Sequence, residues 1–443
     1  MSPGSTPSAS STSRGPPRRP PKLPSSAFAP APVVARRAYP QRILDTHVHL
    51  WTTEQLDQGN ISWPPTCSNA LNDGAHSLED EYAPAVLKGV KMVERHIEAV
   101  ECVYVQAEYK HDDAEKDGSG GGWDSSCAEV KQLSCKRGLL CGVRADVKVL
   151  ALCPWAPVHL GASVLESYLP KITLAASSNS IPIASFRYLL QDSPKGTYLT
   201  PDFISGLHHL GSKGYAFDHT VDSRRGKWML QDSVEMISTL RSQGGTTKII
   251  LDHCGKPDLG SWPRSSNSSG ADNVASKTSH GDWLESIYQL ALFPDVYVKV
   301  SGLLDLCPAE TVDLAAREFE QPQHDASSRQ SVKGGEDAMD ELTARIKKVV
   351  EPILEAFGIE RVMIGSETDS TVLDPDWPMF RACTIPTREK DAHEGRDVVQ
   401  EASAWALGMK LCLDVLLELG LDGPALDRIF EGTAREVYGI SSA

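Results

Sequence analysis

Short apolar runs rich in β-branched residues recur along the chain from residue 42 onward, and segments with helical spacing of apolar positions separate them. Eight runs are typical of buried strands: 42–50, 101–108, 147–158, 181–190, 214–221, 247–257, 295–304 and 361–366. Segments with the spacing of amphipathic helices lie at 82–100, 163–176, 200–214, 229–244 and 341–358. Strands that alternate with helices indicate βαβ units and a parallel sheet. Eight such strands favour an α/β fold of the (β/α)8 TIM-barrel type over a doubly wound sheet.

Several of the expected strands end in polar residues. These are His47 and His49, Gln106 and Glu108, Arg187, His219, His253, Lys299 and Ser366. The C-terminal ends of the strands are where a TIM barrel builds its active site. We therefore expect a polar site at this end of the barrel.

The stretch "DTHVHLW", residues 45–51, places His47 and His49 one residue apart in the first expected strand. Residues i and i+2 of a strand project from the same face, so the two imidazoles should converge on one point. Such a pair suits a metal site or a polar catalytic pocket. Asp45 is expected on the same face but deeper, where it would orient the neighbouring turn. Two histidines and one carboxylate are few ligands for zinc, so a single divalent ion, Zn or Mn, remains optional.

Residues 1–41 differ in composition from the rest of the chain. They are rich in Pro, Ser and Arg, and no acidic residue precedes Asp45. Such a segment predicts a disordered tail, followed by a barrel over residues 42–443. A mitochondrial transit peptide is the alternative, although the prolines disfavour an amphipathic helix. Three further segments rich in Ser, Gly and charge are expected to be loop insertions on the surface: 110–138, 258–281 and 320–337.

Charge and cysteine content restrict the partners and the compartment. The formal net charge of −15 argues against a nucleic acid or an anionic membrane as the main partner. No apolar stretch reaches the roughly 20 residues that a bilayer-spanning helix requires. The ten cysteines contain no Cys-x-x-Cys pair, which predicts free thiols in a reducing compartment. We expect a cytoplasmic protein that acts on a small molecule, and the oligomeric state is left open.

A series of motifs, taken in order, resembles the amidohydrolase-related (type 2) family, in the branch of L-fuconolactonase and 2-pyrone-4,6-dicarboxylate lactonase. The motifs are "DTHVHLW", "SFRYLLQDSPKG" (185–196), "AFD" (216–218), "ILDHCGKP" (250–257), "VYVKVSGL" (296–303), "FGIERVMIGS" (357–366) and "GTAREVYGI" (432–440). The resemblance implies an amidohydrolase-like barrel that opens the ring of a small acidic or sugar-derived lactone.

The resemblance also implies roles for individual residues. A carboxylate at the end of the eighth strand would be the general base. His47, His49 and His253 would polarise the lactone carbonyl, or His47 and His49 would hold a divalent ion together with that carboxylate. Arg187 would bind a carboxylate or a ring oxygen of the substrate.

Other candidates have structural alternatives of similar weight. Glu108, His219 and Trp51 are further substrate-binding candidates, but polar residues also cap strands and packing alone explains a buried tryptophan. Lys299 contacts the substrate or forms a salt bridge in the barrel wall.

The eighth strand departs from the family pattern, which ends in Gly-Ser-Asp-Trp-Pro. This chain reads "GSETDSTVLDPDWP" over residues 365–378. Either Glu367 replaces the aspartate directly, or residues 367–375 are inserted and Asp376 is the base, with Trp377 and Pro378 in register. Three consecutive identities favour Asp376. Displacement of a base by about 1 Å can lower the rate on the order of a hundredfold, so an inactive barrel that only binds a small acid is a further hypothesis.

A metal-dependent decarboxylase is the alternative enzyme, because relatives with that activity share the His-x-His barrel. It predicts a tightly bound metal and loss of activity with a chelator. The segments at 185–192 and 251–257 favour the lactonase branch.

Overall fold

The structure is a computed structural model. It describes residues 37–61, 76–78, 82–107, 109–111, 116–118, 122–135, 147–177, 181–262, 271–320, 334–367 and 396–441. The chain divides into Met1–Arg36 and a compact unit Arg37–Ala443, and all that follows concerns the second unit. The disordered tail was predicted over residues 1–41. Of these, residues 1–36 lie outside the described residues.

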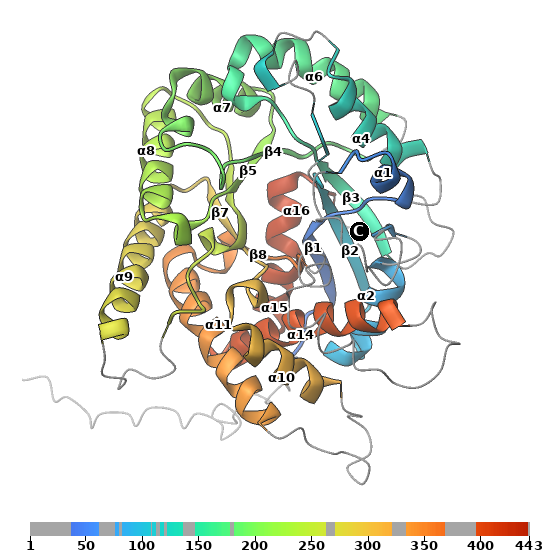
Figure 1. The fold of residues 1–443 in the computed structure, drawn as a ribbon, viewed down its shortest axis with the longest axis vertical. Helices are drawn as coiled ribbons and strands as arrows, with labels where there is room; N and C mark the ends of the chain where they lie inside the picture. The colour runs from blue at the N-terminus through green and yellow to red at the C-terminus, as the bar shows by residue number, and fades with distance from the viewer. Residues whose placement is uncertain are drawn as a thin grey trace, which may run out of the picture. The chain divides into compact units, whose positions relative to one another are not determined.

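Within the described residues, eight parallel strands form the centre of the fold (Figure 1). They are β1 Arg42–Val48, β2 Ala99–Val105, β3 Val147–Cys153, β4 Ser185–Leu189, β5 Ala216–Thr220, β6 Ile249–Leu251, β7 Val296–Val300 and β8 Val362–Ile364. β1 to β3 form one sheet and β4 to β8 a second, each in chain order. Each expected apolar run overlaps one of these strands, as predicted, although β2 begins two residues before the run at 101–108.

Contacts at both edges close the two sheets into a ring. Parallel bridges pair Leu152 with Ile183 and Trp155 with Arg187, which joins the end of β3 to β4. At the other edge, the Thr46 hydroxyl donates to the carbonyl of Ile364 at 2.6 Å. The predicted TIM-barrel-like α/β fold is confirmed.

Helices cover the outside of the ring. They include α1 Thr53–Asp57, α2 Ala83–Val93, α4 Asp124–Cys135, α6 Ala162–Ala176, α7 Pro201–Ser212, α8 Trp228–Ser242, α9 Ala271–Ala291, α10 Ala309–Phe319, α11 Gly335–Phe357, α14 Arg396–Glu418, α15 Gly423–Asp427 and α16 Thr433–Tyr438. α7 shows why such segments are helical. Thr200 caps its first turn by accepting from the Phe203 amide, and Pro201 occupies the first position, where no amide donor is needed. Its buried residues Phe203, Leu207 and Leu210 have helical spacing and face the strands.

The interior of the ring contains an apolar layer with one residue from each strand or its first turn. The layer consists of Leu44, Val103, Ala151, Ala184, Ala216, Ile250, Tyr297 and Met363. Ala434, Val437 and Tyr438 of α16 pack against it, and Figure 1 shows α16 within the arc of strands. These residues fill the N-terminal half of the interior, which leaves the C-terminal ends of the strands for polar groups.

Two of the expected loop insertions contain helices. α4 lies within 110–138, where Trp123 and Val130 are buried, and α9 begins within 258–281. The prediction that these stretches are unstructured loops is wrong for those parts, because apolar side chains among the Ser and Gly residues pack on the barrel. Of the third segment, residues 321–333 lie outside the described residues, and α11 begins at Gly335. No helix among the described residues combines the length and apolar character needed to cross a membrane.

Candidate functional site

An extra residue in β1 determines which side chains of this strand enter the ring. Asp45 pairs with Cys102 and Val48 with Tyr104, so β1 uses one residue more than β2 over the same distance. Such a β-bulge interrupts the alternation of faces. As a result, Asp45 points to the surrounding helices while His47 points inward, and the expectation that they share a face is wrong.

Asp45 ties the ends of β1 and β8 to two helices. The Tyr82 hydroxyl, at the start of α2, and the Trp405 indole, on α14, donate to Asp45 Oδ2 at 2.8 and 3.0 Å. The Ser366 amide, just after β8, donates to Oδ1 at 2.8 Å, and the His47 amide lies 3.3 Å from the same oxygen. Asp45 thereby fixes the segment that carries Glu367 beside the segment that carries His47.

His47 and His49 converge as predicted, with ring centroids 5.0 Å apart. His49 Nδ1 lies 3.0 Å from the carbonyl oxygen of Val105. Because a carbonyl only accepts, Nδ1 carries the proton and Nε2 presents its lone pair. Arg187 Nη1, from β4, lies 3.4 Å from that nitrogen. Burial, followed by the charge of Arg187, lowers the pKa of His49 well below its usual range, so the ring is neutral.

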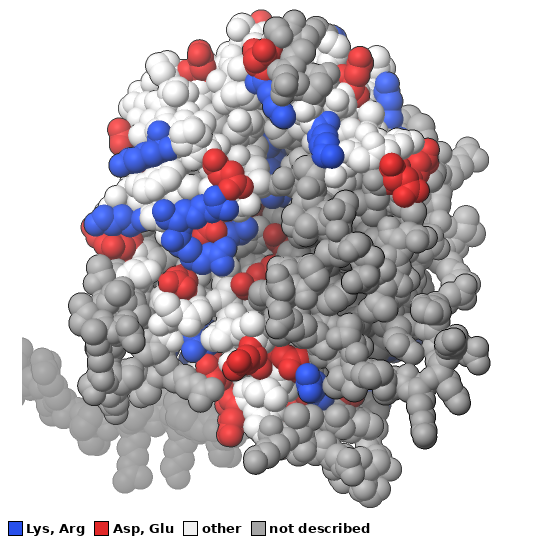
Figure 2. All heavy atoms as spheres, in the orientation of Figure 1, with Lys and Arg blue, Asp and Glu red and all other residues white. Residues whose placement is uncertain are grey.

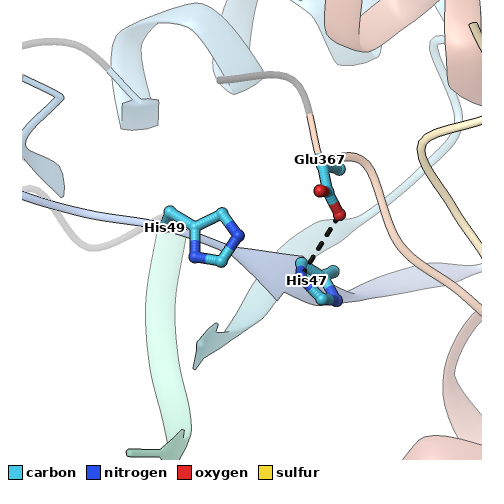
Figure 3. A group of neighbouring side chains, drawn as sticks. All are labelled: His47, His49 and Glu367. Atoms are coloured by element: carbon cyan, nitrogen blue, oxygen red, sulfur yellow. Dashed lines mark ion pairs between the residues drawn. The ribbon is translucent and has the colours of Figure 1, made fainter. Parts of the chain in front are cut away.

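Glu367 lies at the centre of the site. Its Oε2 is 2.7 Å from His253 Nε2 and 3.2 Å from His47 Nε2, and Figure 3 shows the Glu367 carboxylate directed at His47 of β1, with His49 just beyond this strand. On its other side, the His253 ring forms a hydrogen bond of 2.9 Å between Nδ1 and the Ser301 hydroxyl. Burial lowers the pKa of His253 well below its usual range. The imidazoles of His253 and His47 therefore face the same carboxylate oxygen.

The backbone of His253 and that of Glu367 both lie in the left-handed region of φ and ψ. His253 has φ of 51° and Glu367 has φ of 53°. For residues with a Cβ this conformation costs roughly 1–2 kcal/mol each, and such residues cluster at functional sites. Gly302, with φ of 59°, lies beside them, and a Cβ there would approach His253 Nδ1 to 3.1 Å. These turns bring the ends of β6, β7 and β8 together.

A buried network of charges lies beneath the histidines. Lys299 Nζ, from β7, is 2.5 Å from Asp218 Oδ2 and 3.1 Å from Asp252 Oδ1. The Thr220 hydroxyl donates to Asp252 at 2.5 Å, and the Tyr438 hydroxyl donates to Asp218 at 3.2 Å. Burial alone would lower the pKa of Lys299, but the two carboxylates outweigh it and raise that pKa. The salt-bridge alternative for Lys299 is thus the one observed.

The other predicted site residues have different positions. Arg187 is buried, and its Nη1 donates to the carbonyl of Gln106 at 3.3 Å as well as facing His49. His219 lies on the helix side of β5, where its Nε2 is 2.7 Å from the Ser233 hydroxyl of α8, so the structure does not bring it to the cluster. Trp51 packs in a small apolar group with Ile61, Ala107 and Tyr109. Glu108 and Asp376 lie outside the described residues.

Sequence reasoning missed Asp218, Asp252 and Ser301. A signal for the two aspartates was present, since β5 and β6 both lead into an Asp-His pair, "FDHT" and "LDHC". Alternation places neighbours on opposite faces of a strand, so one member of each pair should face the interior.

Two groups of described residues place ligand-type atoms within 4.8 Å of one another. One is His47, His49 and Glu367, and the other is His47, Asp252 and His253. The described residues thus contain a buried cluster of the composition that holds divalent ions.

Residues 231–440 match the model of the amidohydrolase family, and this segment includes His253, Lys299 and Glu367. This match to the amidohydrolase family covers a little under half of the chain. Among solved structures, an amidohydrolase from Burkholderia multivorans with bound zinc has a TM-score of 0.51 at 18% identity, covering 90% of this chain and 99% of that one. At this identity the likeness shows the shared fold.

Two curated proteins are similar to this chain over part of their length. An L-rhamnono-gamma-lactonase of Scheffersomyces stipitis is 30% identical over 35% of this chain and 43% of that protein. An L-fucono-1,5-lactonase of Burkholderia multivorans is 24% identical over 44% of this chain and 49% of that protein. The chain therefore spans about half the length, or less, of the curated relatives it matches.

Proposed function

We propose that this protein opens the ring of a small lactone, with Glu367 as the base that activates water. The observation that carries the proposal is the meeting of Glu367 with His253 and His47, at 2.7 and 3.2 Å, at the ends of β8, β6 and β1. The names of the two curated relatives support a lactone as the substrate. Asp376, the base that motif identity favours, remains the alternative.

Ester hydrolysis makes three demands on such a site. A base must take a proton from water, donors must stabilise the oxyanion that forms, and the leaving ring oxygen must receive a proton. Glu367 meets the first demand, because an ionised carboxylate accepts only, and it returns the proton to the ring oxygen. His253 and His47 supply N–H donors beside it, and Arg187 holds an oxygen of the substrate with its planar guanidinium.

The donor set fits a divalent ion poorly. His49 Nε2 presents a lone pair, but Arg187 Nη1 lies 3.4 Å from it. His47 has Lys299 Nζ 3.3 Å from its Nδ1. An ion bound between these imidazoles would lie next to two full positive charges, whose repulsion in a buried site is large. We therefore assign no step of the reaction to a metal, although the ligand types are suitable.

The substrate is a sugar-derived or an acidic lactone. Lys and Arg side chains gather beside α8 on the face that Figure 2 shows. After β5, the turn Ser223–Arg225 carries Arg224 and Arg225, whose side chains are 39% and 47% exposed and pair with Asp222 and Asp192. Cations at this end of the barrel would favour the approach of an anionic lactone, even in a chain of net charge −15.

The test is a turnover assay on a panel that contains L-rhamnono-, L-fucono- and pyrone-dicarboxylate lactones. Hydrolysis is measured by the protons that it releases. We expect hydrolysis of at least one by the wild-type chain, a loss of about 10²-fold to 10⁴-fold in kcat for Glu367→Gln, and full activity for Asp376→Asn. Loss with Asp376→Asn alone would transfer the role of base to Asp376. Ligand binding without turnover by correctly folded wild type would overturn the proposal and favour a barrel that only binds small acids.

A further inference from the structure

We propose that Lys299 is a positioning residue that fixes the proton of His47 on Nε2, the ring nitrogen that lies towards Glu367. The effect on catalysis rests on the proposed function, whereas the position of the proton does not. Lys299 is fully buried, and its ammonium contacts the His47 imidazole.

The argument starts from the donors of the ammonium group. A lysine ammonium has three N–H donors and no acceptor. Three acceptor candidates surround Lys299 Nζ: Asp218 Oδ2 at 2.5 Å, Asp252 Oδ1 at 3.1 Å and His47 Nδ1 at 3.3 Å. Asp218 Oδ2 and His47 Nδ1 each accept an N–H of the ammonium, and Asp252 Oδ1 lies beside it as an ion-pair partner. His47 Nδ1 must then be the unprotonated nitrogen.

The other tautomer has a weaker partner. If His47 Nδ1 carried the proton, its neighbour would be Asp252 Oδ1 at 3.6 Å, which is too long for a hydrogen bond. The same proton would also point towards the N–H groups of Lys299. Because these three side chains have no exposed surface, water cannot replace the lost interaction.

A neutral imidazole with Nδ1 unprotonated carries its proton on Nε2. That nitrogen lies 3.2 Å from Glu367 Oε2. Asp218 of β5 thus holds Lys299 of β7, and Lys299 in turn orients the His47 ring. The Nε2–H of His47 then lies towards Glu367, the base that follows β8. The same tautomer withdraws the Nε2 lone pair of His47 from any metal ion.

The first experiment measures the tautomer directly in the intact protein. Wild type labelled with ¹⁵N-histidine is compared with His47→Gln, which assigns the His47 signals. We expect long-range ¹H–¹⁵N spectra with Nδ1 unprotonated and Nε2 protonated. A proton on Nδ1 of wild-type His47 would refute the proposal, whatever the activity of the enzyme.

The second experiment removes the ammonium while it preserves the balance of charge. The double variant Lys299→Met/Asp218→Asn loses one cation and one anion, so the network does not retain an extra buried charge. We expect His47 to move its proton to Nδ1, towards Asp252, and kcat to fall about tenfold to a hundredfold with little change in KM. An unchanged tautomer and unchanged kcat in this variant would reduce Lys299 to a structural salt bridge.

Tyr438→Phe is the matched control. It removes a 3.2 Å hydrogen bond to Asp218 in the same network but touches neither Lys299's contact with His47 nor Glu367. We expect a loss of stability with the His47 tautomer and kcat unchanged. If no lactone is turned over while wild-type His47 is protonated on Nε2, the proposed function fails and the role of Lys299 stands.

Discussion

His253 and Glu367 meet through a contact of 2.7 Å between Nε2 and Oε2, and both residues hold left-handed backbone conformations to make it. Neither residue belongs to a strand, since His253 follows β6 and Glu367 follows β8. The barrel places the two strand ends, and the two turns aim the side chains at each other. Because the strained conformations persist in a buried site, surrounding contacts must hold them in place.

The length of the side chain at position 367 should therefore control the rate. Glu367→Asp keeps the charge but withdraws the carboxylate by about 1.5 Å, the length of one C–C bond. We expect kcat to fall on the order of a hundredfold, because displacement of a base by about 1 Å has that effect. The midpoint of urea unfolding should change little. Equal kcat values for Glu367→Asp and wild type would show that Glu367 is not the base.

Asp45 should matter for both stability and activity. It is fully buried and accepts from Tyr82, Trp405 and Ser366. Asp45→Ala leaves these donors without a partner, and we expect it to lower the free energy of unfolding by about 3–5 kcal/mol. Activity should also fall, because the Ser366 contact positions Glu367.

Tyr82→Phe is the control for Asp45→Ala, since it removes a single donor and should lower the free energy of unfolding by only about 1 kcal/mol. Urea unfolding curves measure both losses. A loss for Asp45→Ala no larger than that for Tyr82→Phe would contradict the bracing role of Asp45.

The fold and the histidine pair were predictable from the sequence because they depend on local periodicity. Apolar runs of strand length reveal each strand, and the i, i+2 spacing brings His47 and His49 together. Strand ends also indicated Arg187 and His253, since parallel strands gather their C-terminal ends at one face.

Features that depend on pairing between strands were not predictable in this way. The extra residue in β1 is visible only against the register of β2, and it turns Asp45 away from His47. His219 lies near the end of β5, but its ring faces Ser233 of α8 and not the interior of the ring. Motif identity favours Asp376, which lies outside the described residues, and it carries no information about the left-handed turn at Glu367.

His219 should make stability depend on pH. Burial lowers its pKa to about 4, against about 6.5 for an unfolded histidine. Between these values the unfolded state binds more protons than the folded state, so the free energy of unfolding falls as pH decreases from 6.5 to 4. This group alone should account for about 2 kcal/mol between pH 7 and pH 5.

The measurement compares urea unfolding of wild type and His219→Gln at pH 7 and pH 5. Other buried histidines, such as His49 and His253, contribute in the same direction and remain in both proteins. The variant should therefore lose less stability on acidification than wild type does. Identical losses would show that His219 is not held neutral by the fold.

Removal of metal ions should leave the reaction intact. Arg187 Nη1 lies 3.4 Å from His49 Nε2, and Lys299 Nζ lies 3.3 Å from His47 Nδ1. The positive charges of these two side chains oppose the binding of a divalent ion. We expect enzyme dialysed against a chelator to retain its kcat, and added zinc to leave it unchanged. A strong loss on dialysis that zinc restores would support a metal-dependent reaction and would count against the donor role of His47.

Lys299→Met alone should be more damaging to stability than the charge-balanced double variant. The single change leaves Asp218 and Asp252 buried without their cation, and loss of one partner of a buried ion pair costs about 3–5 kcal/mol. In Lys299→Met/Asp218→Asn a neutral amide replaces one of the two carboxylates that lack their cation. Part of the lost free energy of unfolding should therefore be recovered. The free energies of unfolding of wild type, both single variants and the double variant form a thermodynamic cycle, and we expect a coupling energy between Lys299 and Asp218 of about 1–3 kcal/mol. A coupling near zero would mean that Asp252 alone balances the ammonium, and that Asp218 has no part in holding Lys299 beneath His47.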